Sequence, residues 1–404
     1  MIPFTMTRLC LRQTRISAAR FLRKPFSQKL SARFTVTNGA APSLKLVSGK
    51  DKLVGGWLLT CSGMAFGAVV LGGITRLTKS GLSMVDWHPF DEGRPRTEQD
   101  WQREFEKYQQ FPEFKITNRD MTLEQFKSIY WMEYIHRMWG RTIGAVYFIP
   151  AAAFWALGYL RGGMKQRVVL MGGLLAGQGL MGWYMVKSGL EEKQGYDTTP
   201  RVSNLRLAAH LGTAFVLYAF LFRSGLQLLL PPQQLAPTQA LRKLIVFGHM
   251  SKGLVFFTVL SGALVAGIEA GLVYNSFPKM ADRWIPTDVL AFDPKWRNFF
   301  ENPTTVQFDH RILGESVFCA ITALYLYSRK VPMPPRARFA ANVVLAAAWM
   351  QVALGITTLL NYVPTHLAAT HQAGALTLFT TLLWLTHELK IDKKLVKTLR
   401  AIPK

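Results

Sequence analysis

The chain has 404 residues, of which 50% are hydrophobic and 18% are charged, whereas soluble domains carry roughly 25% charged residues. Its 48 Lys and Arg outnumber its 24 Asp and Glu, so the net charge is +24. This composition argues against a soluble globule, and three cysteines without a C-x-x-C pair exclude a disulfide scaffold, a zinc ribbon and a covalently attached c-type heme.

The N-terminal segment is strongly basic. Residues 1–53 contain 11 Lys and Arg and a single acidic residue, Asp51. Arginines recur among Leu, Ile and Phe, without the continuous apolar stretch of a secretory signal. The pattern predicts a mitochondrial transit peptide and basic segment over residues 1–50, and a disordered basic tail is the alternative.

Eight apolar runs dominate the rest of the chain, and most of them carry no charged residue. A membrane-spanning helix needs about 20 apolar residues, so we extend the shorter runs by a turn. Pro364 separates the last two runs, because proline can break a helix. The sequence therefore predicts an all-α membrane protein with eight transmembrane helices. The runs are 54–75, 142–160, 168–186, 207–222, 244–268, 312–328, 339–365 and 366–387.

The loops between these runs differ in charge on the two sides of the predicted membrane. Loops 159–167, 223–243 and 329–338, on the side of the N-terminus, contain 3, 3 and 4 basic residues and no acidic residue. On the other side, residues 75–135 contain 9 basic and 11 acidic residues, and residues 268–309 contain 4 and 6. The positive-inside rule then puts both termini in the matrix of a mitochondrial inner membrane. With lipid around the helices, the net charge needs no nucleic acid as a partner.

The two halves of the chain repeat each other. Each half contains four apolar runs, an even number, so both halves enter the membrane in the same orientation. This predicts two tandem, same-orientation four-helix bundles, over residues 51–235 and 236–390, followed by a basic tail at 391–404. The matched segments are Val70-Leu71-Gly72 with Leu260-Ser261-Gly262, Glu133–Gly140 with Gln307–Gly314, and Gln178–Gly182 with Gln351–Gly355.

Four of the eight histidines, His136, His210, His310 and His371, lie at matched positions near the outer ends of the even-numbered runs. An ionisable residue inside a membrane helix indicates a functional site by default. Two imidazoles at equal depth on parallel helices can bind one metal between them. Because thiolates are absent and carboxylates are few nearby, heme iron is the natural candidate. Hydrogen bonding between helices is the alternative for these histidines.

Two arginines directly follow matched histidines in the sequence. Arg137 and Arg311 are candidates to bind heme propionates by charge and forked geometry, and snorkelling to the membrane surface is the alternative. The remaining histidines are weaker candidates. His88 lies in a loop, His249 lies near the inner end of the fifth run, and His366 has no counterpart in the first half.

A family resemblance follows from these motifs together. The E-x-x-H-R motif Glu133–Arg137, the segment Thr75–Trp87, the paired membrane histidines and the tandem layout resemble the heme A synthase family of the mitochondrial inner membrane. The resemblance extends over about residues 54–390 and is nearest to the animal-type members.

The resemblance implies an enzyme, a heme-dependent oxidoreductase that makes heme A for cytochrome c oxidase assembly. Family members oxidise the C8 methyl group of heme O to a formyl group by successive hydroxylations. One half holds a permanent heme b and the other receives heme O, which a heme O synthase supplies, while a ferredoxin-type protein supplies electrons. Many bacterial members carry a cysteine pair in the first outer loop, and residues 75–135 contain no cysteine, so the resemblance does not extend to a thiol relay.

The residues then divide between the two halves. We expect His310 and His371 to bind heme b, because Gln307 in place of a carboxylate suits a closed electron-transfer site. His136 and His210 would bind the substrate heme iron, with Glu133 as the catalytic acid or base. The sequence leaves Glu133 a second role, a salt bridge to Arg137 or Arg141, or a hydrogen bond to a loop.

Two other function classes stay open at this point. A diheme b-type transmembrane electron carrier would bind two identical permanent hemes, and a transporter would use the buried histidines as a proton relay. Self-association into a homo-oligomer is also open, because nothing in the residues decides it.

Overall fold

A computed structural model describes residues 47–88, 93–191, 200–231, 233, 235 and 237–391. Residues 1–46 of the predicted transit peptide and basic segment, and nearly all of the basic tail, lie outside these residues. The described residues form helices and contain no strand. In chain order, the α-helices are α1 (Gly49–Leu77), α2 (Glu98–Gln109), α3 (Pro112–Ile116), α4 (Leu123–Ala156), α5 (Met164–Gly189), α6 (Asn204–Leu229), α7 (Gln239–Gly267), α8 (Asn298–Glu301), α9 (Pro303–Ser328), α10 (Pro335–Leu360) and α11 (Thr365–Glu388).

Each of the eight predicted runs coincides with a long helix. Five of these helices, α1, α5, α6, α7 and α10, are long and apolar enough to cross a membrane, judged on the described residues. The other three, α4, α9 and α11, have 34, 26 and 24 residues. They carry three of the four matched histidines and polar neighbours such as Glu133, Asp309 and Gln372, which lower their hydropathy. The polar residues that point to a site therefore weaken the membrane signal of the helices that carry them.

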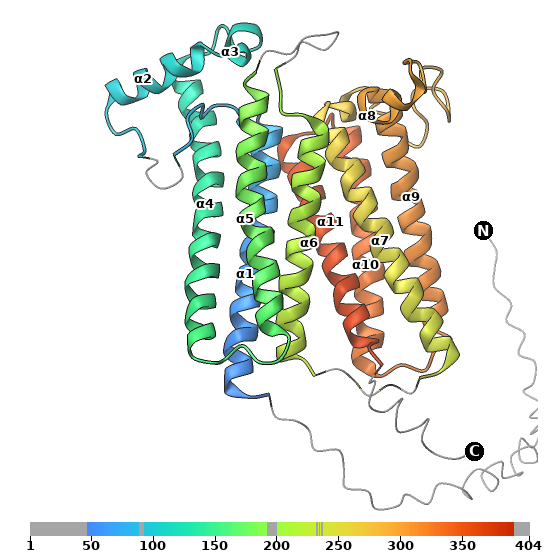
Figure 1. Ribbon diagram of the computed structural model, residues 1–404. Helices are drawn as coiled ribbons and strands as arrows, with labels where there is room; N and C mark the ends of the chain where they lie inside the picture. Colours follow the sequence, from blue (N-terminus) through green and yellow to red (C-terminus); the bar gives the residue numbers. More distant parts are fainter. Residues whose placement is uncertain are drawn as a thin grey trace, which may run out of the picture. The chain divides into compact units, whose positions relative to one another are not determined.

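The eight long helices pack as two sets of four helices (Figure 1). In the first set, α4 and α6 each pack on α1 and α5. In the second, α9 and α11 each pack on α7 and α10. The helices that carry the matched histidines are thus at opposite corners of each set, separated by the helices that do not. The sets meet where α6 packs on α7 and α1 packs on α11.

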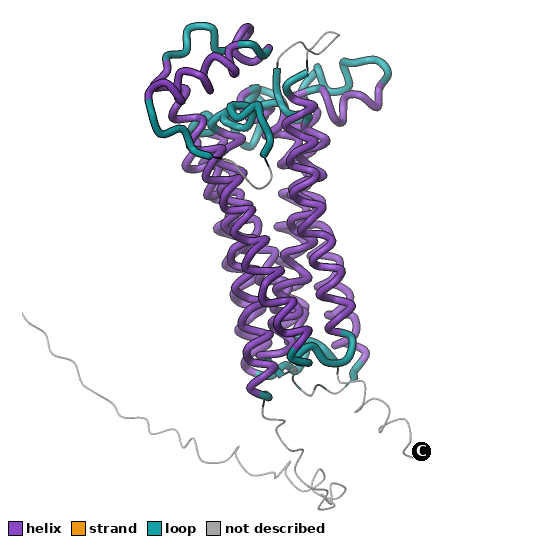
Figure 2. The backbone as a smooth tube through the Cα atoms, turned by 60° about the vertical axis from the view of Figure 1, so that its left-hand side comes forward, coloured by secondary structure: helices purple, strands orange, loops and turns teal. Residues whose placement is uncertain are grey.

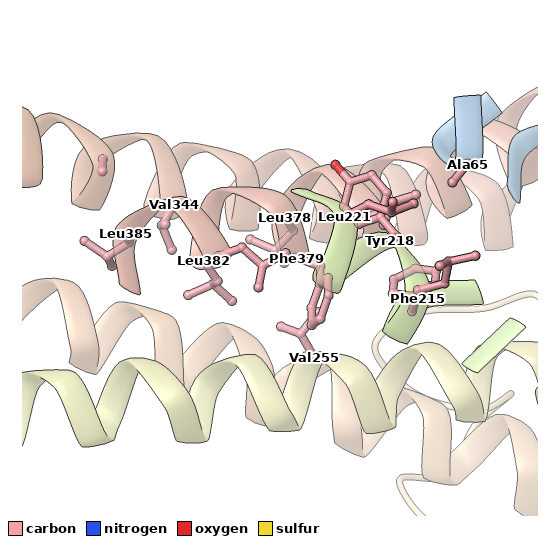
Figure 3. Close-up of a cluster of buried hydrophobic side chains, with 14 of the residues drawn as sticks. Ala65, Phe215, Tyr218, Leu221, Val255, Val344, Leu378, Phe379, Leu382 and Leu385 are labelled. Carbon is pink, nitrogen blue, oxygen red and sulfur yellow. The ribbon is translucent and has the colours of Figure 1, made fainter. Parts of the chain in front are cut away.

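The apolar core lies where the two sets meet. Figure 3 shows Phe215 and Leu221 of α6 beside Phe379 and Leu382 of α11, with Val255 of α7 across from them. All five side chains are at most 6% exposed. A polar contact crosses the same boundary, because the Tyr218 hydroxyl lies 2.7 Å from Thr380 Oγ1.

The segment between α1 and α4 was predicted as a loop, but it contains two helices, α2 and α3. Helices α2 and α3 lie at one end of the long helices, which we call the cap end, and the opposite end is the basic end (Figures 1 and 2). Helix α2 begins at a capping box formed by Thr97 and Asp100, and α4 begins at a second one formed by Thr122 and Gln125. These helices bury a second apolar cluster, the cap cluster, which consists of Met84, Trp101, Phe105, Tyr108, Phe126 and Tyr130.

The limits of α4 differ from those of the predicted run at 142–160. The capping box lets the helix begin at Leu123, nineteen residues earlier. It ends at Ala156, because Gly158 takes a φ of +65°, a conformation that favours glycine and stops a helix. The site residues Glu133 and His136 therefore lie well inside a continuous helix.

Candidate functional site

All four matched histidines lie toward the cap end. His210, His310 and His371 are six, seven and six residues after the first residues of α6, α9 and α11, or about 9–10 Å along each helix axis. His136 lies further along α4, because that helix extends into the cap. The helix limits therefore place three of the four histidines at similar distances from the first residues of their helices, and His136 thirteen residues from the first residue of α4.

The second pair has the geometry of a two-histidine metal site. The rings of His310 and His371 have centroids 6.5 Å apart and planes at 87°. An imidazole nitrogen lies about 2.0–2.1 Å from a bound transition metal, so two rings that face one iron have centroids about 6 Å apart. The described residues contain no cluster of three or more His, Cys, Asp or Glu. Two histidines without further protein ligands fit a heme, because the porphyrin supplies the other four ligands.

Each histidine ring packs against a glycine of a neighbouring helix. A Cβ atom added to Gly262 of α7 would lie 3.1 Å from His310 Cε1, and one added to Gly355 of α10 would lie 2.9 Å from His371 Cε1. In the first half, a Cβ on Gly72 would lie 3.0 Å from His136 Cε1. Any larger residue would displace these rings, so the glycines set the ring positions.

Polar side chains hold the Nδ1 atoms of three of these rings. Ser261 Oγ lies 2.7 Å from Nδ1 of His310, and Gln351 Nε2 lies 3.1 Å from Nδ1 of His371. Gln178, with its amide oriented so that both ends find partners, lies 3.0 Å from Nδ1 of His210. Such partners usually orient a metal-binding imidazole. Ser261 Oγ can accept the Nδ1–H of His310, whereas the two amide nitrogens donate to the Nδ1 atoms of His371 and His210.

His136 is the exception. Its Nδ1 atom is buried and has no hydrogen-bond partner among the described residues. The repeat places Leu71 at the position of Ser261, so an apolar side chain stands where the second half has a hydroxyl.

Glu133 lies one turn before His136 and is almost completely buried, with 2% of the residue exposed. Its Oε2 accepts hydrogen bonds from Ser83 Oγ (2.7 Å) and the Met84 backbone N–H (2.9 Å). Its Oε1 accepts two from Arg137, at 3.1 and 2.6 Å. A carboxylate has about four acceptor positions, and these four donors fill them.

The guanidinium of Arg137 also reaches the segment that follows α1. It donates to the carbonyl oxygens of Met84 (2.7 Å) and Asp86 (3.0 Å). Together, Glu133 and Arg137 fasten this segment to α4.

Gln307 and Arg311 repeat this arrangement in the second half. Gln307 Nε2 donates to the Ala270 carbonyl (2.7 Å), and Arg311 donates to Gln307 Oε1 (3.0 Å) and to the Tyr274 carbonyl (2.9 Å). Each pair has i,i+4 spacing and fastens the segment that follows the preceding long helix. Arg311 Nε is buried and has no partner among the described residues, so one donor remains for a ligand.

A cavity of about 490 Å³ opens beside Arg137 at the cap end of the first half. This volume is in the range of small-molecule sites, about 300–1,000 Å³. Trp87 and Trp183 give it apolar walls, and their ring centroids lie 5.7 Å apart. Its charged lining has both signs, because Arg137 and Lys187 lie beside Asp86 and Glu191. The cavity therefore suits a ligand with a flat apolar body and charged or polar groups at its edge.

The other histidines lie apart from these pairs. The carbonyl of His88 accepts a hydrogen bond from Arg141, which ties its loop to α4. His249 lies 3.1 Å from Lys252 Nζ and His387 Nε2 lies 2.9 Å from the Leu230 carbonyl, both toward the basic end. His366 is exposed in the first turn of α11.

The sequence indicated the histidines but not the residues that hold them. Ser261, Gln178, Gln351 and the three glycines beside the rings carry no motif of their own. A signal was present, because all of them lie inside the repeated segments, where a shared position indicates a shared role.

The chain has many close relatives. Residues 55–383 match the family described as cytochrome oxidase assembly protein. The heme A synthase of Homo sapiens is 60% identical over 341 residues, which cover 84% of this chain and 83% of that protein. The heme A synthase of Arabidopsis thaliana is 43% identical over 387 residues, with coverages of 93% and 84%. The bacterial heme A synthase of Nitrosospira multiformis is 47% identical over 338 residues, with coverages of 83% and 92%. The matched family segment contains all four histidines of the site.

Proposed function

The chain belongs to the cytochrome oxidase assembly protein family, and on this premise we infer that it is a heme A synthase, an oxidoreductase that converts heme O to heme A. The observation that carries the inference is the facing pair of His310 and His371, whose separation and right-angled planes fit one heme iron. A family of enzymes that act on heme needs sites of this kind.

We propose that the second half holds a permanent heme b. His310 and His371 are its ligands, and both have polar partners at Nδ1. When bound, the heme supplies a one-electron redox centre within the membrane. Arg311 has a buried donor atom for a propionate.

We propose that the first half binds heme O as substrate. His136 and His210 occupy the matched positions, and the cavity beside Arg137 and Lys187 lies at the same end. Its aromatic walls suit the flat porphyrin, and its two basic residues, which lie beside Asp86 and Glu191, are the candidates to bind the propionates. The reaction oxidises the C8 methyl group of this heme to a formyl group.

Glu133 has two proposed roles in this reaction. As a catalytic group it would deliver or accept a proton near the substrate heme, as the sequence motif predicts. As a positioning group it would hold the segment around Met84 above the histidine pair. Its four hydrogen-bond donors favour the positioning role, because they leave no acceptor position for substrate or water.

We propose that all eight long helices cross a mitochondrial inner membrane as two tandem four-helix bundles. The packing of α4 and α6 on α1 and α5, and of α9 and α11 on α7 and α10, supports this arrangement. The charge of the loops supports a cap end in the intermembrane space and both termini in the matrix. A ferredoxin-type donor would then approach from the basic end, and a heme O synthase would deliver substrate within the same membrane.

Pigments extracted from cells that lack this protein provide the test. We expect heme O to accumulate and heme A to disappear, and reintroduction of the gene to restore heme A. Purified His310→Ala protein should lose its heme b absorption. Unchanged heme A in the deficient cells, with two permanent hemes in the purified protein, would instead favour an electron carrier.

A further inference from the structure

We propose that one repeated position, occupied by Leu71 in the first half and Ser261 in the second, sets how firmly each half holds its heme. Ser261 makes the second half a retaining site, and Leu71 leaves the first half able to release its heme. This inference rests on the proposed function, because a synthase must keep one heme and exchange the other.

The two positions are equivalent in space as well as in sequence. Gly72 and Gly262 follow them, and an added Cβ would lie 3.0 Å from His136 Cε1 and 3.1 Å from His310 Cε1. Helices α1 and α7 therefore present the same backbone to the two rings. The side chains at positions 71 and 261 start from matching places and differ only in chemistry.

The hydroxyl of Ser261 also determines which nitrogen of His310 carries the proton. Ser261 Oγ donates its single hydrogen to the Thr258 carbonyl oxygen at 2.8 Å. The same oxygen lies 2.7 Å from His310 Nδ1, so it accepts the Nδ1–H there. His310 Nε2 is then unprotonated, which is the form that binds iron. The helix thus prepares the ligand before heme arrives.

Leu71 provides no such acceptor. The Nδ1 atom of His136 is buried and has no partner among the described residues. The two halves agree at the opposite corner, where the amide nitrogens of Gln178 and Gln351 lie beside Nδ1 of His210 and His371. They differ at His136 and His310, since only His310 has an acceptor for its Nδ1–H. Loss of an outer partner typically lowers metal affinity by about 10- to 100-fold.

Transfer of heme from the purified, detergent-solubilised protein to an excess of apomyoglobin measures this difference. We expect heme to leave the first half in a fast phase and the second half in a slow phase. His310→Ala should abolish the slow phase, which would assign that phase to the second half. Leu71→Ser should slow the fast phase by about 10-fold, because it gives His136 an acceptor. Ser261→Ala should accelerate the slow phase by a similar factor.

Two further measurements separate positioning from a general loss of stability. Ser261→Ala should raise the midpoint potential of heme b, because His310 loses the acceptor that makes its ring a stronger donor to iron. Ser261→Thr keeps the hydroxyl and should restore both the potential and the slow phase.

Matched controls are available on α9. Leu326→Ser adds the same hydroxyl at a site that is 59% exposed and sixteen residues beyond His310. Ser316→Ala removes a hydroxyl that bonds only to the Ile312 carbonyl. Neither variant should change either phase or the potential.

Two failures can be told apart. Release phases and a potential that do not respond to Leu71→Ser and Ser261→Ala would overturn this inference and leave the proposed function intact. Wild-type protein that binds no heme in either half would overturn the proposed function and this inference with it.

Discussion

At the scale of single residues, the site depends on small side chains as much as on its histidines. Gly262 and Gly355 lie against the rings of His310 and His371, where any Cβ atom would come within about 3 Å. Close contact on one side keeps each ring from rotating out of the interior. Ser261 and Gln351 then fix the rotation of the ring plane from Nδ1. The sequence shows the ligands, whereas these contacts decide their geometry.

The first prediction tests the glycine contact. Gly262→Ala should displace His310 by a few tenths of an ångström and accelerate heme b loss on the order of 10-fold. Gly253→Ala on the same helix is the control, because an added Cβ there meets nothing within 4 Å. Alanine also favours a helix over glycine by up to about 1 kcal/mol, so the control should fold at least as well as wild type. Equal heme retention in both variants would contradict the contact's role.

The second prediction concerns a buried carboxyl in the cap. Burial raises the pKa of the Glu113 carboxyl from 4.5 to about 7, although the Tyr108 hydroxyl donates to it at 3.1 Å. More distant charges act in both directions, with Glu133 raising the pKa and Arg76 and Lys79 lowering it. A raised pKa stabilises the folded cap fully below about pH 4.5, and this contribution is lost as pH rises through about 7.

Glu113→Gln should therefore stabilise the cap at pH 8 and have little effect at pH 5. The difference at pH 8 is about 3 kcal/mol at most, since one pKa unit corresponds to about 1.4 kcal/mol. Hydrogen exchange of residues 98–120, corrected for the intrinsic rate at each pH, measures it. Glu106→Gln changes an exposed residue that bonds to Gln102 and should show no such dependence on pH. A constant difference between wild type and Glu113→Gln across this range would refute the assignment.

At the scale of helices, each half uses the same device to fasten its cap segment. In α4 the pair Glu133 and Arg137 binds the segment after α1, and in α9 the pair Gln307 and Arg311 binds the segment after α7. Only the first half uses a carboxylate. Its ion pair is 12% and 3% exposed at the two side chains, so breaking it is costly.

The third prediction asks what this carboxylate does. Glu133→Gln copies the second half and should leave heme b in place, because His310 and His371 are unchanged. Heme A formation should fall, by about 10²- to 10⁴-fold if Glu133 transfers a proton. Heme O or a hydroxylated heme should accumulate in pigment extracts. A well-folded variant with normal heme A output would return Glu133 to a structural role.

Ser83→Ala distinguishes the two roles of Glu133. It removes one donor to the carboxylate and keeps the carboxylate itself. If Glu133 positions the segment, this variant should reproduce part of the loss seen with Glu133→Gln. If Glu133 is a catalyst, heme A formation should stay near the wild-type rate.

At the scale of the whole molecule, the two ends of the protein differ in their residues. Helices α4, α6, α9 and α11 begin at the cap end (Figure 1), and each carries its matched histidine in its first half. The cavity beside Arg137 and the cap cluster are formed by residues near the same end. The loops that join α4 to α5 and α9 to α10 lie at the basic end and contain Arg161 and Lys330. The residues proposed to bind heme thus lie near one end of the protein, and the basic loops lie at the other.

The fourth prediction follows from this difference between the cap end and the basic end. Trypsin added to mitoplasts should cut the 88–120 region and spare residues 329–338, which a tag at the C-terminus would report. Detergent should make both regions accessible and serves as the control. Cleavage at 329–338 in intact mitoplasts would reverse the proposed orientation.

The sequence by itself determined the positions of the long helices and the paired histidines. Apolar runs must be shielded from water along their whole length, so the approximate positions of the long helices appear in composition alone. The beginning of α4 does not, because its first turns are polar and start at the capping box of Thr122. The repeat revealed the histidines, because duplicated residues keep their spacing along the chain. The sequence missed α2 and α3, because their apolar residues alternate with charged ones and bury only one face, although the capping box at Thr97 was readable.

Only the tertiary structure decided how the histidines are held. Whether Ser261 meets His310, or Gly355 meets His371, depends on the rotation and depth of one helix against another, which no local pattern records. The same is true of Glu133, whose partners Ser83 and Met84 lie about 50 residues away in the chain. Helices of one composition can pack in several registers, and side-chain contacts across the bundle select among them. The difference between the two halves, a hydroxyl facing one histidine and a leucine at the matching position, therefore gains its meaning only in the folded protein.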